Sequence, residues 1–166
     1  MKSRQKIYQI TSIFLIFDQF IKLLVNNYLN LHQEITIIPN FFSIYYVKNT
    51  GAAFSILKDS TLLLTILSVV CIIIIDDLIK KEENINKLGI ISLGCILGGM
   101  FGNLIDRILH HGVIDYLSFT IFNYDFPIFN LADIGITVGV VVLAISILIE
   151  KDSSSINSNK KKSKNK

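Results

Sequence analysis

Long apolar runs alternate along this chain with stretches that mix aromatic, β-branched and polar residues. The apolar runs cover residues 7–25, 60–75, 88–105 and 131–149. A helix needs about 20 apolar residues to cross a hydrocarbon core, and these runs meet or approach that length. The pattern therefore predicts an α-helical membrane protein with four transmembrane helices. Four glycines between positions 94 and 102 give the third run a small-residue surface that favours close helix packing.

The two stretches between these helices have a different character. Residues 26–59 contain ITIIPNFFSIYYVKN, and residues 108–130 contain GVIDYLSFTIF. β-Branched and aromatic residues broken by Pro and Gly favour short strands, and Tyr and Phe suit a membrane interface. We therefore expect a small β-rich cradle or lid on the extracytoplasmic side of the membrane.

Composition and charge support a membrane protein and suggest its orientation. The chain is 51% hydrophobic and only 17% charged, which is too apolar for a typical soluble domain. Basic residues gather in three places that four crossings bring to one side, and the positive-inside rule makes that side cytoplasmic. Both termini are thus expected in the cytoplasm, and no basic patch suggests nucleic acid. The clustered residues are Lys2, Arg4, Lys6, Lys80, Lys81, Lys87, Lys151, Lys160, Lys161, Lys162, Lys164 and Lys166.

The two ends of the chain call for separate interpretations. The first apolar run follows MKSRQK as a signal peptide would, but it contains Asp18 and Lys22 and no small-residue cleavage site follows it. We expect it to remain as a helix in a single membrane domain of residues 1–152. Residues 153–166 consist mainly of Ser, Asn and Lys, which predicts a disordered cytoplasmic tail able to contact anionic lipid.

Several polar residues lie in or beside the apolar runs, where ionisable groups are costly and usually functional. The predicted topology places all of them near the outer interface, although they come from separate segments. They are Asp18, Lys22, Asn49, Gly51, Asn103, Asp106, Arg107, Asp115, Asn130 and Asp133.

Two of the four acids have a basic residue close by in sequence. Asp18 and Lys22 are one helical turn apart, which allows a direct ion pair. Asp106 precedes Arg107, but adjacent helical residues do not face each other, so we expect its partner elsewhere. Both acids are therefore interpreted as structural.

Asp115 and Asp133 have no cation next to them in sequence. If they lie close together they cannot both ionise cheaply, so they share a proton and provide an acid and a base that can activate water. An alternative interpretation remains open on spacing alone. Asp115 could be a turn residue, and Asp133 a helix N-terminal residue favoured by the helix dipole.

Five short motifs follow one another along the chain. They are DQFIK at 18–22, NTGAAF at 49–54, GGMFGNLIDR at 98–107, VIDY at 113–116 and FNLAD at 129–133. In order, spacing and chain length this set resembles lipoprotein signal peptidase, the type II signal peptidase of bacteria. Each motif is weak alone, but five in register are specific, and they cover nearly all of the chain between its termini.

The resemblance implies a function and a set of site residues. It implies an aspartic endopeptidase of the bacterial inner membrane that cleaves prolipoproteins before their diacylglyceryl-modified Cys, using water and no covalent intermediate. Asp115 and Asp133 would be the catalytic pair, at the outer leaflet. No cofactor or metal is implied. The supporting shell, which would line the site and hold substrate backbone, is Asp18, Lys22, Asn49, Gly51, Asn103, Asp106, Arg107 and Asn130.

Two other kinds of protein could use acids inside a membrane. A small transporter or proton relay should carry polar groups at successive depths, but the inner halves of the four runs are nearly free of charge. A structural or assembly protein would use the acids to hold helices together. In that case, loss of Asp115 would lower protein abundance instead of turnover.

Overall fold

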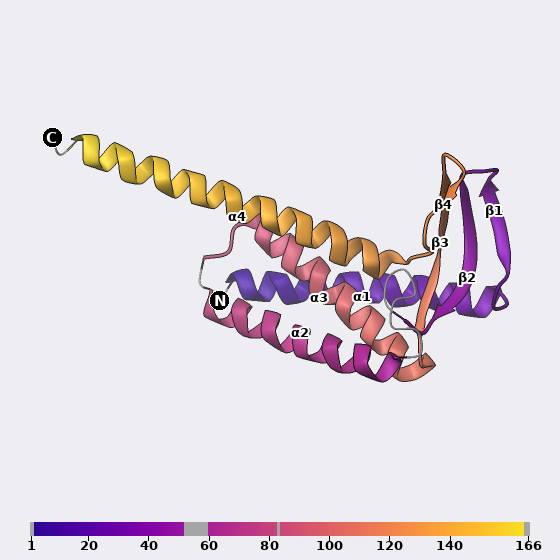
Figure 1. Cartoon of the computed structure of the whole chain (residues 1–166). Helices are drawn as coiled ribbons and strands as arrows, with labels where there is room; N and C mark the ends of the chain where they lie inside the picture. Colours follow the sequence, from indigo (N-terminus) through magenta and orange to yellow (C-terminus); the bar gives the residue numbers. More distant parts are fainter. Residues whose placement is uncertain (1, 52–59, 83, 165–166) are drawn as a thin grey trace.

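The computed structural model describes residues 2–51, 60–82 and 84–164 and contains four long helices with a small sheet. Figure 1 shows the sheet standing across one end of the helices, with the start of α1 and the end of α4 at the opposite end. All four helices are long and apolar enough to cross a membrane, as the hydrophobic pattern predicted. They are α1 (Lys2–Tyr28), α2 (Thr61–Lys81), α3 (Lys87–His110) and α4 (Leu131–Lys164).

Helix α3 is the central helix and packs against each of the other three. Its glycines permit this, because side chains or backbone of the neighbours occupy the space where a Cβ atom would lie. Ile10 of α1 fills this space at Gly94, and Phe14 of α1 fills it at Gly98. The predicted small-residue packing surface is therefore confirmed.

The sheet has four antiparallel strands in the order β1-β2-β3-β4. The segment between α1 and α2 and the segment between α3 and α4 contribute two strands each, which confirms the strands expected in them. The register places Val47 opposite Asp115 and Asn49 opposite Val113, so the end of β2 lies beside the start of β3. The strands are β1 (Glu34–Ile38), β2 (Phe42–Asn49), β3 (Val113–Ile121) and β4 (Tyr124–Asp125).

Helix α2 extends six residues beyond the apolar run that predicted it. Its last turns are polar, and Lys80 and Lys81 form ion pairs with Asp76 and Asp77 one turn earlier, each at 2.5 Å. A hydropathy window detects the part of a helix that suits hydrocarbon and misses such charged ends. Residues 76–81, which follow the apolar run, are therefore helical as well.

Helix α4 is also longer than its apolar run. Its first 20 residues, Leu131–Glu150, form the candidate membrane span. The helical backbone continues to Lys164 and so enters residues 153–166, for which we predicted disorder. Disorder of this tail in solution, and the boundary at residue 152, stay predictions.

Candidate active site

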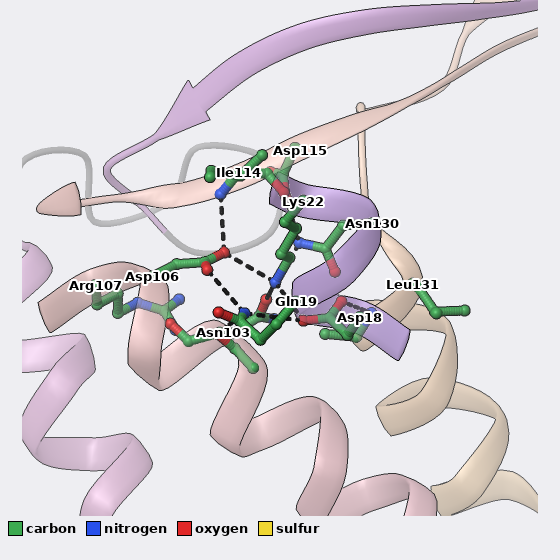
Figure 2. A network of polar contacts seen from close by, with 12 residues as sticks. Asp18, Gln19, Lys22, Asn103, Asp106, Arg107, Ile114, Asp115, Asn130 and Leu131 are labelled. Carbon is green, nitrogen blue, oxygen red and sulfur yellow. Dashed lines mark hydrogen bonds and ion pairs between the residues drawn. The ribbon is translucent and has the colours of Figure 1, made fainter. Parts of the chain in front are cut away.

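A buried ammonium group lies at the centre of the polar cluster (Figure 2). Lys22 is 1% exposed, and its Nζ donates to Asp18 Oδ2 at 2.9 Å, Asp106 Oδ2 at 2.8 Å and Asn103 Oδ1 at 2.9 Å. Three acceptors thus satisfy the three donors of the ammonium. The predicted pair between Asp18 and Lys22 is confirmed. The partner of Asp106 is Lys22 and not the neighbouring Arg107.

The two carboxylates that bind Lys22 also hold backbone groups of other elements. The Ile114 N–H of β3 donates to Asp106 Oδ2 at 3.1 Å, and the Ala132 N–H of α4 donates to Asp18 Oδ1 at 3.0 Å. Each of these backbone groups belongs to the residue directly before one of the two predicted catalytic acids. The ion-paired acids therefore position the backbone from which those catalytic candidates project.

Gln19 is a member of this cluster that the sequence analysis missed. Its Nε2 donates to Asp106 Oδ1 at 3.1 Å, to the Gly102 carbonyl oxygen at 3.2 Å and to Asp18 Oδ2 at 3.3 Å. It thereby links α1 to α3 across the ion pairs. The available signal was a second polar residue beside Asp18 within an apolar run, inside the DQFIK motif.

Asp115 lies on β3 and is only 2% exposed. Its Oδ2 accepts from Asn49 Nδ2 at 2.9 Å, and its Oδ1 accepts from Asn130 Nδ2 at 2.7 Å. Burial, and then the nearby charge of Asp133, raise the pKa of Asp115 to about 7. This residue is part of a strand, so its interpretation as a turn residue is wrong.

Asp133 lies in the first turn of α4, and its side chain takes part in a reciprocal cap with Asn130. The Asp133 N–H donates to Asn130 Oδ1 at 2.9 Å, while the Asn130 N–H donates to Asp133 Oδ2 at 3.1 Å. This is the arrangement of a capping box. The second carboxylate oxygen, Oδ1, accepts from Asn103 Nδ2 at 2.8 Å. Asp133 is therefore a helix N-terminal residue that also reaches the centre of the cluster.

Asp115 and Asp133 line the same cavity, which has a volume of about 530 Å³. Four members of the predicted shell also line it, namely Asn49, Gly51, Asn103 and Arg107. The other four, Asp18, Lys22, Asp106 and Asn130, lie beneath the cavity among the contacts described above. The structure thus divides the predicted shell into a lining and a supporting layer.

The cavity lining combines polar and apolar residues. Arg107 is its cation: Nη1 donates to the Asn103 carbonyl oxygen at 3.3 Å, and among the described residues no carboxylate forms an ion pair with it. Gly51 donates its N–H to Asn49 Oδ1 at 2.9 Å, and residues 52–54 of the NTGAAF motif lie outside the described residues. Thr137 also belongs to the lining, whose apolar part consists of Val113, Phe126, Ile128, Phe129, Ile134, Ile136 and Val138.

No group of three or more His, Cys, Asp or Glu side chains in the described part of the chain could hold a metal ion. The polar groups that line the cavity are carboxylates, amides and a guanidinium. Four apolar helices, a sheet across one end and two acids in one cavity define a multi-pass membrane protein with a candidate acid–base site.

Comparison with known proteins identifies the family. Residues 10–149 match the signal peptidase (SPase) II family, and the chain belongs to it. The lipoprotein signal peptidase of Symbiobacterium thermophilum is 41% identical over 132 residues, which cover 80% of this chain and 87% of that protein. The one from Maridesulfovibrio salexigens is 36% identical over 147 residues, covering 86% and 94%.

Solved structures agree with this assignment. Two structures described as bacterial membrane enzymes give TM-scores of 0.79 and 0.75, at 33% and 32% sequence identity. The alignment with the first structure covers 89% of this chain and 88% of the solved chain, and the alignment with the second covers 84% and 90%. The family resemblance carried by the five motifs is confirmed, and the transporter alternative is not favoured.

Proposed function

We propose that this protein is an aspartic endopeptidase that removes the signal peptide from prolipoproteins, with Asp115 and Asp133 as its catalytic pair. The observation that carries the proposal is their shared cavity, in which each carboxylate accepts two hydrogen bonds from N–H donors. The two remaining buried acids are engaged by Lys22. Relatives named lipoprotein signal peptidase supply the substrate class.

The proposed mechanism is general acid–base hydrolysis by a pair that shares one proton. The raised pKa of Asp115 favours a protonated Asp115 below about pH 7. Asp133 removes a proton from water, whose oxygen bonds to the scissile carbonyl carbon while Asp115 protonates the carbonyl oxygen. The tetrahedral gem-diol intermediate then collapses: one of its hydroxyl groups returns a proton to Asp115 as the carbonyl re-forms, the C–N bond breaks, and the leaving amine takes up the proton that Asp133 had accepted.

The lining suggests how the substrate would be held. We propose that Arg107 and Asn49 bind backbone carbonyl groups of an extended peptide, since both present N–H donors at the cavity. The apolar part of the cavity lining suits the hydrocarbon of a membrane-anchored, diacylglyceryl-modified peptide. Cleavage is then expected directly before the modified Cys.

The experiment that tests this function is cleavage of a purified prolipoprotein by the purified protein in lipid. The diacylglyceryl-modified substrate should be cut so that the modified Cys becomes the new N-terminus. The same substrate with an unmodified Cys is the matched control and should remain intact. If neither substrate is cut, the proposed function is wrong, and equal cutting of both would remove the requirement for the lipid.

We propose that the sheet and the cavity lie at the outer surface of the membrane and both termini in the cytoplasm. The basic clusters support this orientation, and the sheet stands at the end of the bundle opposite the start of α1 (Figure 1). In a background lacking Cys71 and Cys95, Phe122→Cys at the fully exposed β3–β4 turn should react with an impermeant maleimide in intact cells. Ser155→Cys should react only after permeabilisation, and the reverse pattern would contradict this orientation.

A further inference from the structure

Lys22 lies beneath the active-site cavity and is not part of its lining. An ammonium group has only donors, so an amide that faces it must present its oxygen. Asn103 does so, with Oδ1 2.9 Å from Lys22 Nζ. The Nδ2 of the same amide therefore points the other way, where it donates to Asp133 Oδ1 at 2.8 Å.

The same amide oxygen also determines the contact to the second acid. Asn103 Oδ1 accepts from Asn130 Nδ2 at 3.1 Å, and Asn130 Nδ2 donates in turn to Asp115 Oδ1 at 2.7 Å. An asparagine amide is nearly symmetric in shape and can rotate by half a turn unless its partners prevent it. If Asn103 rotated, its oxygen would face the Asp133 carboxylate and its NH₂ would face the NH₂ of Asn130. Both new contacts would be repulsive.

We propose that Lys22 is a positioning residue for the peptidase reaction: it fixes the Asn103 amide and, through it, the donors that hold both catalytic carboxylates. This inference rests on the proposed function of Asp115 and Asp133. It assigns Lys22 a role in turnover in addition to its ion pairs with two buried acids. Lys22 acts without touching the substrate, because its side chain is enclosed.

The charge of Lys22 also acts on the proton of the catalytic pair. It lowers the pKa of Asp115, against the larger raising effects of burial and of Asp133. Loss of this charge should therefore raise the pKa of Asp115 further, and Asp115 would keep its proton to higher pH. Asp18 on α1 and Asp106 on α3 contact Lys22 directly. The acids of the cluster, Asp133 on α4 included, interact electrostatically in turn with Tyr46 on β2, Arg107 on α3 and Tyr116 on β3.

The test compares Lys22→Met/Asp106→Asn with Asp106→Asn alone. Removing Lys22 by itself would leave two buried carboxylates without their cation, and such a change is strongly destabilising. The double variant keeps the net charge of the ion-paired trio. Relative to Asp106→Asn, we expect kcat to fall about 10- to 100-fold, the range found when outer partners that orient metal ligands are removed. KM should change little, and the high-pH limb of the kcat profile, near pH 7 in the wild type, should move to higher pH.

A double-mutant cycle separates this role from structural support. In an Asn103→Leu background, the Lys22 substitution should cause no further loss of kcat in the folded fraction, because its target amide is absent. If this double variant yields no folded protein, Lys22→Gln/Asp106→Asn replaces it, which likewise keeps the net charge of the trio. Glutamine can donate or accept, so it cannot enforce the orientation of Asn103, and the same changes are expected.

Provided that the wild type is active, two results would overturn the inference. The first is a kcat and a pH profile of the double variant that equal those of Asp106→Asn at matched folded yield. The second is a loss of kcat on substitution of Lys22 that is as large in the Asn103→Leu background as with Asn103 present. An inactive wild type would instead refute the proposed function.

Discussion

Asp115→Asn and Asp133→Asn should each lower kcat for prolipoprotein cleavage by about 10²- to 10⁴-fold, the usual contribution of a general acid or base. An amide has nearly the size of the carboxylate but cannot exchange the proton that the reaction needs. Each carboxylate accepts hydrogen bonds at both oxygens, so the new NH₂ group faces an N–H donor and the folded yield of each variant has to be measured as well. The measurement is initial cleavage rates at equal concentrations of folded protein.

Asp106→Asn is the matched control, since the same substitution is made in the same buried cluster. Asp106 lies beneath the cavity and binds Lys22 and the Ile114 N–H, so its loss should cost stability and leave residual turnover. If Asp115→Asn remained active while Asp106→Asn was inactive and folded, Asp106 would become the partner of Asp133. A loss of abundance with normal specific activity would favour a structural role for the acids.

The helices, and the end of the bundle at which the polar cluster lies, follow from the sequence because the hydrocarbon of a membrane and the basic residues constrain them. Hydrocarbon requires long apolar helices, and the basic residues then determine which helix ends lie together. This was enough to predict that Asp115 and Asp133 meet near one end of the bundle, and they line one cavity there. The β-branched and aromatic content of residues 26–59 and 108–130 was enough to predict strands in both segments.

The partners of individual side chains could not be predicted, because they depend on packing between elements that are distant in sequence. Asp106 binds Lys22 because α1 and α3 approach closely at Gly102, where a Cβ atom would overlap Asp18 Oδ2. Likewise, the contact between Asn49 and Asp115 requires the register of β2 against β3. The spacing of these residues along the sequence reveals neither of the two contacts.

Gly99→Ala is expected to destabilise the protein and to slow cleavage. A Cβ atom at Gly99 would overlap the carbonyl oxygen of Ala132 and lie 2.9 Å from Ile136 Cγ1. A backbone carbonyl cannot rotate away as a side chain can, so α4 itself would have to move from α3. Overpacking of this kind typically costs about 1–3 kcal/mol, against a gain of about 1 kcal/mol for Ala over Gly in a helix.

Gly89→Ala is the matched control on the same helix. There the added Cβ would lie 2.8 Å from the branch methyl Cγ2 of Ile85, which rotation about χ1 can move, and its other near neighbours are also side-chain atoms. The stability of Gly89→Ala should therefore equal or exceed that of the wild type. Thermal unfolding in detergent and kcat for prolipoprotein cleavage, measured on both variants, check the prediction. Equal stability and equal kcat in the two variants would contradict it.

The loss of activity in Gly99→Ala should exceed what its stability alone explains. Ala132 is held through its N–H by Asp18, and the next residue is the proposed catalytic Asp133. Moving the start of α4 would displace this carboxylate relative to Asp115, which β3 holds separately. A displacement of about 1 Å in an active site can cost about 10²-fold in rate. We therefore expect a kcat deficit even at temperatures where Gly99→Ala is fully folded.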